Sequence, residues 1–251
     1  MTPLLGLTGV RSRARATTDV DALAAPSGPP PTWATLGELT SPLAAVRLVG
    51  AVPRLASMPR GDGHLVVDIP GWQAPELSGA PLRAYLRRLG YDARGWGFGT
   101  NTGDPRRDVD RLSARLLDLV DETGSPASLV GWSLGGVIAR EVARRHPEAV
   151  RRVVTYGTPV SGPRHTSVAR FFGAGSGDAE RVTRRLDAES PISVPLTVIF
   201  SRRDGVVAWQ ACLDRSTPGV EHVEVSSTHI GLGVDPDVWA VVAERLAAPA
   251  R

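Results

Sequence analysis

Residues 127–146 read ASLVGWSLGGVIAREVARRH, and this stretch decides how the rest of the chain is interpreted. The short apolar run ASLV passes directly into GWSLGG, and a helix-forming segment follows without a linker. The chain must therefore reverse at Ser133, and Gly131, Gly135 and Gly136 lack the Cβ atoms that would collide in so tight a turn. The pattern G-x-S-x-G makes Ser133 a candidate nucleophile. A chain with 27 glycines can also contain this pattern by chance, so its context must decide.

The chain after Gly61 alternates short apolar runs with amphipathic segments. The expected strands span 64–69, 91–96, 127–130, 150–156, 196–200 and 222–225, and the expected helices span 81–89, 108–123, 134–146 and 237–247. Right-handed crossovers between parallel strands place helices on both faces of such a sheet. The sequence therefore predicts a doubly wound α/β domain with a mostly parallel sheet of about six strands.

The N-terminal region differs from the rest of the chain. Residues 1–30 run into the proline-rich stretch APSGPPP and are expected to form a tail or linker. A domain is expected at 31–251. Between Trp33 and Ser57, apolar residues recur at helical spacing, and Pro42 and Pro53 interrupt the pattern. This segment forms either helices that lie against the domain or an interfacial segment that meets lipid.

Composition restricts the classes of function. Hydrophobic residues make up 42% and charged residues 22% of the 251 residues, which is ordinary for a globular protein. The net charge is only +3 and arginines alternate with acids, which argues against nucleic-acid binding. The chain has one cysteine, Cys212, and neither H-x-x-H nor C-x-x-C spacing, so we expect no metal or cofactor. The N-terminal apolar run precedes its arginines, which is the reverse of a secretory signal, and no run of about 18 apolar residues is present. We therefore expect a cytoplasmic protein.

Catalytic residues of an α/β sheet are expected just past the carboxyl ends of its strands. Ser133 meets this condition, and so does His229, which follows the last strand in VEVSSTHIGLG. The other histidines lie at strand starts, at a helix end or in an irregular region: His64, His146, His165 and His222. Asp204, in SRRDGVV after the strand PLTVIF, is the favoured acid. Its rivals are Asp187 and Asp235, and Asp235 lies near a helix start, where a capping role is expected.

A serine hydroxyl needs a base, and the base must be oriented by an acid. The expected catalytic residues are therefore Ser133, Asp204 and His229. A developing oxyanion would be stabilised by the backbone N–H of Leu134, at the start of a helix. The second donor would be the N–H of Trp72, in VVDIPGWQAPELSG. The alternative is that PGW is merely a turn.

The segments DIPGW, LVGWSLGGVIAREVARRHPEAVRRVVTYGTP, FSRRDGVVAW and SSTHIGLG resemble the α/β-hydrolase superfamily, and more narrowly its lipase/esterase branch of G-x-S-x-G serine hydrolases. The resemblance covers about residues 61–246 and implies the same three catalytic residues and the same two oxyanion donors. It departs from lipases in two respects. Pro70 stands where a histidine is usual, and no opening pair of antiparallel strands is evident ahead of His64.

The resemblance also implies a cap or lid at about residues 160–194, over the active site. Phe171 and Phe172 would either face an acyl pocket or anchor the cap to the core. Further candidates for the substrate pocket are Trp132, Trp209 and Ile230. Trp132 and Trp209 could equally serve packing.

The expected function is hydrolysis of a carboxylic ester, from a small molecule or a lipid, through an acyl-enzyme. Acyltransferase, thioesterase and polyester depolymerase activities use the same residues and remain alternatives. A non-catalytic binding protein on the same fold is a further alternative.

Overall fold

The computed structural model describes residues 14–17, 23, 25–169, 185–186 and 189–249. A single seven-stranded sheet runs through the molecule in the order β1-β7-β6-β5-β4-β2-β3. Adjacent strands from β7 to β3 are parallel, and β1 is antiparallel to β7. The strands are β1 (Arg15–Thr17), β2 (Leu65–Ile69), β3 (Asp92–Gly95), β4 (Ala127–Trp132), β5 (Val150–Tyr156), β6 (Leu196–Ser201) and β7 (Glu221–Val225).

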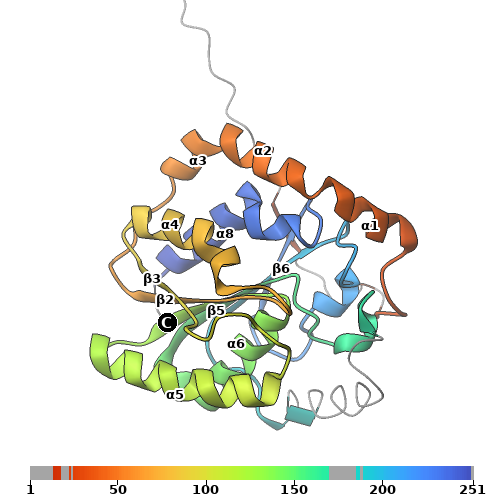
Figure 1. The fold of residues 1–251 in the computed structure, drawn as a ribbon. Coiled ribbons are helices and arrows are strands. Elements are labelled where there is room, and N and C mark those ends of the chain that lie inside the picture. Colours follow the sequence, from red (N-terminus) through yellow and green to blue (C-terminus); the bar gives the residue numbers. More distant parts are fainter. Residues whose placement is uncertain (1–13, 18–22, 24, 170–184, 187–188, 250–251) are drawn as a thin grey trace, which may run out of the picture.

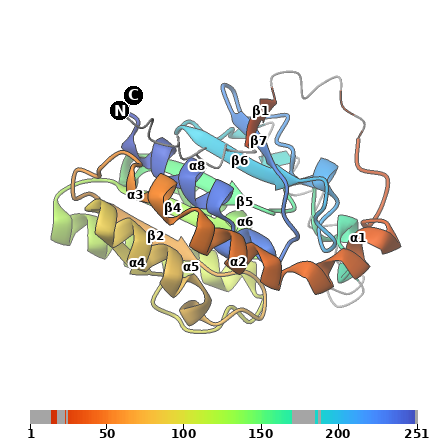
Figure 2. The same ribbon diagram turned by 90° about the horizontal axis from the view of Figure 1, so that it is seen from above.

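Helices cover both faces of the sheet, as the sequence predicts (Figures 1 and 2). The α-helices in the described residues are α1 (Thr32–Gly37), α2 (Pro42–Gly50), α3 (Val52–Ala56), α4 (Ala80–Leu89), α5 (Pro105–Thr123), α6 (Leu134–Arg145) and α8 (Pro236–Ala247). Short 3-10 helices join them, and four of these matter here: η1 (Glu38–Thr40), η2 (Glu76–Gly79), η6 (Trp209–Cys212) and η7 (Gly231–Val234). This arrangement confirms the predicted α/β-hydrolase fold.

The core has one layer on each side of the sheet. Alternate residues of a strand face opposite sides. Val67 and Leu129 therefore pack with α5 and α6, whereas Val66 and Val130 pack with α4 and α8. Helices α1, α2 and α3, together with η1 between α1 and α2, form an additional arc outside α4 and α8 (Figure 1). None of the described helices has both the length and the apolar character needed to cross a membrane.

The expectation of a tail over residues 1–30 is wrong for Arg15–Thr17. These residues form β1 and extend the sheet to a seventh strand, with Ala16 paired to Val223 of β7. The unpaired backbone groups at an open sheet edge can bind another segment of chain whatever side chains that segment carries. The sequence RAT therefore need not show the side-chain pattern of a strand. The cap expected at about 160–194 stays a prediction, because 170–184 and 187–188 lie outside the described residues.

A buried ion pair ties α6 to the connection between β6 and β7. Arg140 Nη1 lies 2.6 Å from Asp214 Oδ2. Asp214 Oδ1 accepts hydrogen bonds from the backbone N–H groups of Ser216, at 2.9 Å, and Thr217, at 3.0 Å. Burial by itself would raise the pKa of Asp214, but the Arg140 guanidinium and these hydrogen bonds outweigh burial and lower the pKa to about 2.

Replacement Asp214→Asn is expected to lower the free energy of unfolding by about 3–5 kcal/mol, because the buried Arg140 guanidinium loses the carboxylate that balances its charge. Urea unfolding at pH 7 measures this. The folded-state pKa lies below the unfolded value of about 3.9, so the stabilisation is present above that value and is lost as the pH falls towards 2. Asp110→Asn, in the exposed pair with Arg145, is the control and should cost less than about 1 kcal/mol. Equal losses in the two variants would contradict the prediction.

Candidate active site

Ser133 occupies a strained turn between β4 and α6. Its backbone angles are φ 53° and ψ −121°, which residues other than glycine rarely adopt. The N–H of Ser133 donates to the carbonyl oxygen of Tyr156, at 2.9 Å, which fixes the turn against β5. A Cβ atom on Gly135 would lie 2.2 Å from the carbonyl oxygen of Ile69. Only glycine therefore lets α6 begin directly against the end of β2, as the G-x-S-x-G pattern predicts.

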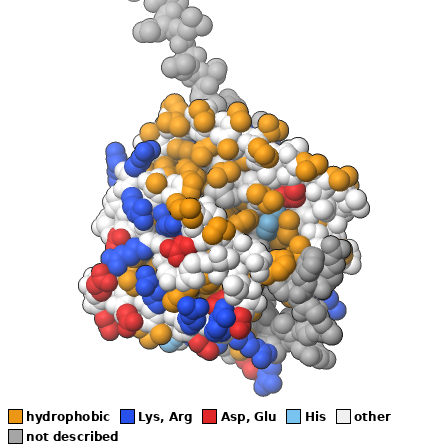
Figure 3. All heavy atoms as spheres, viewed as in Figure 1, with side chains coloured by type: hydrophobic (Ala, Val, Ile, Leu, Met, Phe, Trp, Pro, Cys, Tyr) orange, Lys and Arg blue, Asp and Glu red, His pale blue; other side chains and the backbone are white. Residues whose placement is uncertain are grey.

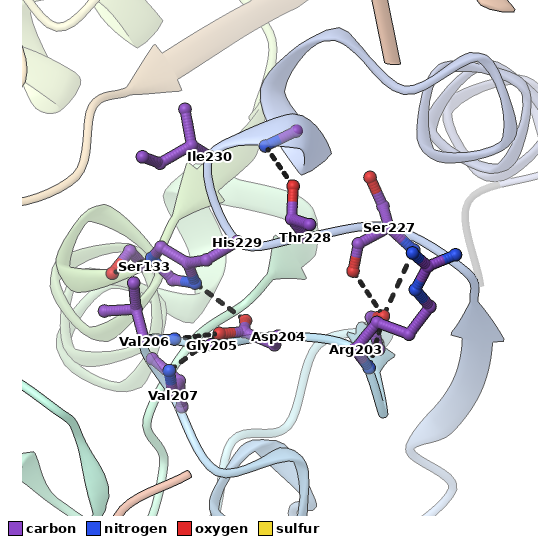
Figure 4. A network of polar contacts seen from close by, with 12 residues as sticks. Ser133, Arg203, Asp204, Gly205, Val206, Val207, Ser227, Thr228, His229 and Ile230 are labelled. Carbon is purple, nitrogen blue, oxygen red and sulfur yellow. Dashed lines mark hydrogen bonds and ion pairs between the residues drawn. The ribbon is translucent and has the colours of Figure 1, made fainter. Parts of the chain in front are cut away.

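The structure brings the three expected catalytic side chains into one hydrogen-bonded chain (Figure 4). The Oγ of Ser133 lies 3.1 Å from Nε2 of His229. Nδ1 of His229 lies 2.7 Å from Oδ2 of Asp204. The other oxygen, Oδ1, accepts from the backbone N–H groups of Val206, at 2.9 Å, and Val207, at 2.7 Å. These bonds fix the carboxylate so that Oδ2 faces the imidazole.

The charges around His229 favour its protonated form. Burial lowers the pKa of the imidazole, but the Asp204 carboxylate outweighs burial, and the Glu38 carboxylate adds to it, so the pKa is raised above its usual value. Asp204 and His229 are 3% and 4% exposed. An imidazole that binds a proton more readily is suited to accept the proton of a serine hydroxyl.

A second Asp–His–Ser chain lies at the opposite edge of the sheet. His64 Nδ1 contacts Asp62 Oδ1, and His64 Nε2 lies 2.9 Å from the Oγ of Ser128. Ser128 lies inside β4 and is fully buried, so no substrate can reach its hydroxyl. His64 directly precedes β2, in agreement with the expectation that it lies at a strand start.

The remaining candidate acids and histidines have other positions. Asp235 is the N-cap of α8, where its side chain accepts from the N–H of Asp237 at 2.8 Å, as expected of a capping residue. His222 lies in β7, and its Nε2 accepts from the backbone N–H of Asp214. His146 is the C-cap of α6. Asp187 lies outside the described residues.

The loop after β2 lies directly against Ser133. A Cβ atom on Gly71 would lie 3.2 Å from the Cβ of Ser133, and Trp72 is the next residue. The side-chain amide of Asn101 supports this loop, because its Nδ2 donates to the carbonyl oxygen of Pro70 at 2.9 Å. Leu134 is the first residue of α6. Both expected oxyanion donors therefore belong to segments that adjoin Ser133, and their catalytic role stays a prediction.

The expected pocket residues do not all lie beside the triad. The half-buried ring of Trp132 lies 5.6 Å from the His229 ring, and the exposed Ile230 follows His229 directly (Figure 4). Trp209 stacks on Phe200 at 5.9 Å and lies under the guanidinium of Arg202 at 4.0 Å. These contacts support a packing role for Trp209. Phe171 and Phe172 lie outside the described residues.

Two residues at the site were missed by the sequence analysis. Gly157, in the YGTP segment, has φ 60°, and a Cβ atom there would lie 3.0 Å from Nδ1 of His229. This segment ends one of the stretches that resemble α/β-hydrolases, but the resemblance did not indicate its contact with the imidazole. The second is Glu38, whose carboxylate accepts from the backbone N–H of His229 at 2.7 Å. The two residues are 191 positions apart, and no sequence pattern links them.

Potential metal ligands do not gather in the described part of the chain, where no three His, Cys, Asp or Glu side chains form a metal-binding group. The lack of a cofactor stays a prediction.

Comparison with known proteins agrees with the observed fold. The family model described as alpha/beta hydrolase fold matches residues 80–191. The mature lipase of Bacillus licheniformis has a similar structure, with a TM-score of 0.55, 14% identity, and coverage of 77% of this chain and 95% of that chain. The chain therefore has the α/β-hydrolase fold.

Curated relatives carry the name pimeloyl-[acyl-carrier protein] methyl ester esterase. The protein of Aromatoleum aromaticum is 50% identical over 93 residues, which are 37% of this chain and 36% of that protein. The protein of Photobacterium profundum is 28% identical over 179 residues, which are 66% of each. Among the first relatives matched, the chain spans between 10% and 50% of their length.

Replacement Gly157→Ala is expected to displace the His229 ring, because the new methyl group would lie at 3.0 Å from Nδ1. Gly219→Ala is a matched control, since Gly219 has φ 69° and open space around it. Both variants should lose about 1–2 kcal/mol of unfolding free energy through backbone strain. Only Gly157→Ala should shift the imidazole resonances of His229 in an NMR spectrum. Unshifted resonances in that variant would refute the contact.

Proposed function

We propose that this protein is a serine hydrolase that cleaves carboxylic ester bonds, with Ser133 as nucleophile, His229 as general base and Asp204 as the acid that orients the imidazole. The observation that carries the proposal is the hydrogen-bonded chain from Ser133 Oγ to Asp204 Oδ2, at 3.1 Å and 2.7 Å, which begins at a strained turn. Strain of this kind is kept where it serves a mechanism.

The proposed reaction has two acyl transfers. In the first, Nε2 of His229 takes the proton of Ser133 while Oγ attacks the ester carbonyl carbon. The N–H groups of Trp72 and Leu134 stabilise the oxyanion, and the C–O bond breaks as the alcohol takes the proton from His229. In the second transfer, water gives a proton to Nε2 of His229 while its oxygen attacks the acyl carbon. The bond from that carbon to Oγ then breaks, the carboxylic acid leaves, and His229 returns the proton to the Oγ of Ser133.

Ester bonds are favoured among the possible substrates because curated relatives are named methyl ester esterases. Acyltransferase, thioesterase and polyester depolymerase activities would use the same side chains with another acceptor or another leaving group. The hydrogen-bonded triad argues against a purely binding role, which requires none of these contacts. The particular ester and the expected cytoplasmic localisation stay predictions.

We further propose that the substrate is met at a lipid surface, through the arc formed by α1, α2 and α3. Seven large apolar side chains on the arc are 57–83% exposed: Trp33, Leu36, Leu39, Leu43, Val46, Val49 and Val52. Hydrophobic side chains gather over this arc in Figure 3. An amphipathic segment normally turns its apolar face to the core. In α1 and at the start of α2, small or polar residues such as Ala34, Ser41 and Ala44 are buried instead, while α3 buries Leu55. The large apolar side chains of the outer face are thus exposed and suited to a lipid surface.

Replacement Ser133→Ala is expected to reduce hydrolysis of p-nitrophenyl esters by a factor on the order of 10⁴ or more, because no nucleophile remains. Ser128→Ala is the matched control, since it makes the same change in the second Asp–His–Ser chain and should leave turnover within about twofold of the wild type. Esters of increasing acyl length should be compared in both variants. Undiminished turnover by Ser133→Ala would refute the role of Ser133.

The double variant Val46→Ser/Val49→Ser is expected to weaken binding to phosphatidylcholine vesicles about tenfold, because two exposed apolar side chains are lost. Leu77→Ser/Leu117→Ser, at two exposed leucines outside the arc, is the control and should bind like the wild type. Turnover of a soluble short-chain ester should not change in either double variant. If the two double variants sediment with vesicles to the same extent, the arc is not the lipid-binding surface.

A further inference from the structure

Glu38 connects the two loops that hold the acid and the base of the candidate triad. Its Oε1 accepts hydrogen bonds from the backbone N–H of Gly205, at 2.8 Å, and of His229, at 2.7 Å. Its Oε2 accepts from the N–H of Ile230 at 3.1 Å. Gly205 follows Asp204 directly. One carboxylate of η1 therefore ties the backbone next to Asp204 to the backbone of His229.

The neighbours of Glu38 hold the carboxylate in this position. Thr35 Oγ1 donates to the carbonyl oxygen of Gly205 at 3.0 Å. The Oγ of Ser41 lies 2.8 Å from Thr228 Oγ1 and donates to Glu38 Oε2 at 3.2 Å. A Cβ atom on Gly205 would lie 2.2 Å from the carbonyl oxygen of Ala34, so α1 packs directly against the loop of the acid.

Glu38 also contributes charge to the site. The charged groups that act on the imidazole of His229 within the described residues are Asp204, from the loop after β6, and Glu38, from η1. Trp132 and Ser133, which face the ring from β4 and the turn before α6, carry no charge. A second negative charge favours the imidazolium that forms when Ser133 gives up its proton.

We infer that Glu38 is a positioning residue, which keeps Asp204 and His229 aligned through backbone hydrogen bonds and stabilises the protonated imidazole through its charge. This inference rests on the proposed function of the triad and adds to it a residue from outside the three catalytic loops. The segment around η1 would thus help to align the catalytic groups.

The test compares the wild type with Glu38→Gln, Glu38→Ala and the control Glu148→Gln, at an exposed glutamate of the 3-10 helix Pro147–Ala149. Glu38→Gln keeps one oxygen acceptor but removes the charge, whereas Glu38→Ala removes both. NMR titration of the His229 imidazole reports the pKa without any substrate. The pH dependence of kcat and KM for a short p-nitrophenyl ester reports the reaction.

The pKa of His229 should fall in both Glu38 variants, and the acidic limb of the kcat profile should move to lower pH with it. Neutral imidazole is the active base, so this limb follows the pKa of His229. We expect kcat to fall about 10- to 100-fold in Glu38→Ala and less than tenfold in Glu38→Gln, because misalignment is costly. KM should change less than about twofold, because Glu38 binds loop backbone and not substrate. Glu148→Gln should match the wild type.

An unchanged His229 titration in Glu38→Gln would overturn the inference, even if the variant is less stable, because a merely structural role does not move that pKa. If Glu38→Ala does not fold, the His229 titration in Glu38→Gln by itself tests the inference. An inactive wild type would refute the proposed function, while the NMR titration would still decide whether Glu38 acts on His229.

Discussion

The close approach of α6 to the ends of β2 and β4 is the constraint on which the rest of the site depends. Gly135 lets the first turn of α6 meet the carbonyl oxygen of Ile69, where a Cβ atom would lie at 2.2 Å. The chain can then reverse at Ser133, which adopts φ 53°. The same approach brings the loop after β2 against Ser133 and the end of β5 against its N–H. Three adjacent strands thus converge on Ser133.

Backbone amides hold the charged groups of this site. The carboxylates of Asp204 and Glu38 both contact His229, and both accept hydrogen bonds from loop N–H groups. A charge in a buried place is costly unless it is paired or hydrogen-bonded. These hydrogen bonds offset the free energy that burial of the charges costs, and they also fix the position of the imidazole. In the Asp62–His64–Ser128 chain, similar contacts reach a serine that is buried inside a strand.

The arc of α1, α2 and α3 has two faces with different relations to the site. Its inner face places Glu38 on the loops of Asp204 and His229, and Arg47 pairs with Asp235, which caps α8, at 2.7 Å. Its outer face exposes large apolar side chains. The segment is therefore both a support of the proposed catalytic groups and the proposed contact with lipid, and the two faces belong to the same short helices.

The sequence by itself determined the parallel strands, the turn at Ser133, and the placement of Asp204 and His229 after strand ends. These features are local, because strand and helix periods and a glycine-rich reversal leave their pattern in consecutive residues. Only the tertiary structure decided that β1 joins the sheet, that Gly157 touches His229, and that Glu38 binds residues 167 and 191 positions away. Such contacts involve backbone groups, which every residue carries, so the side-chain pattern contains no signal for them.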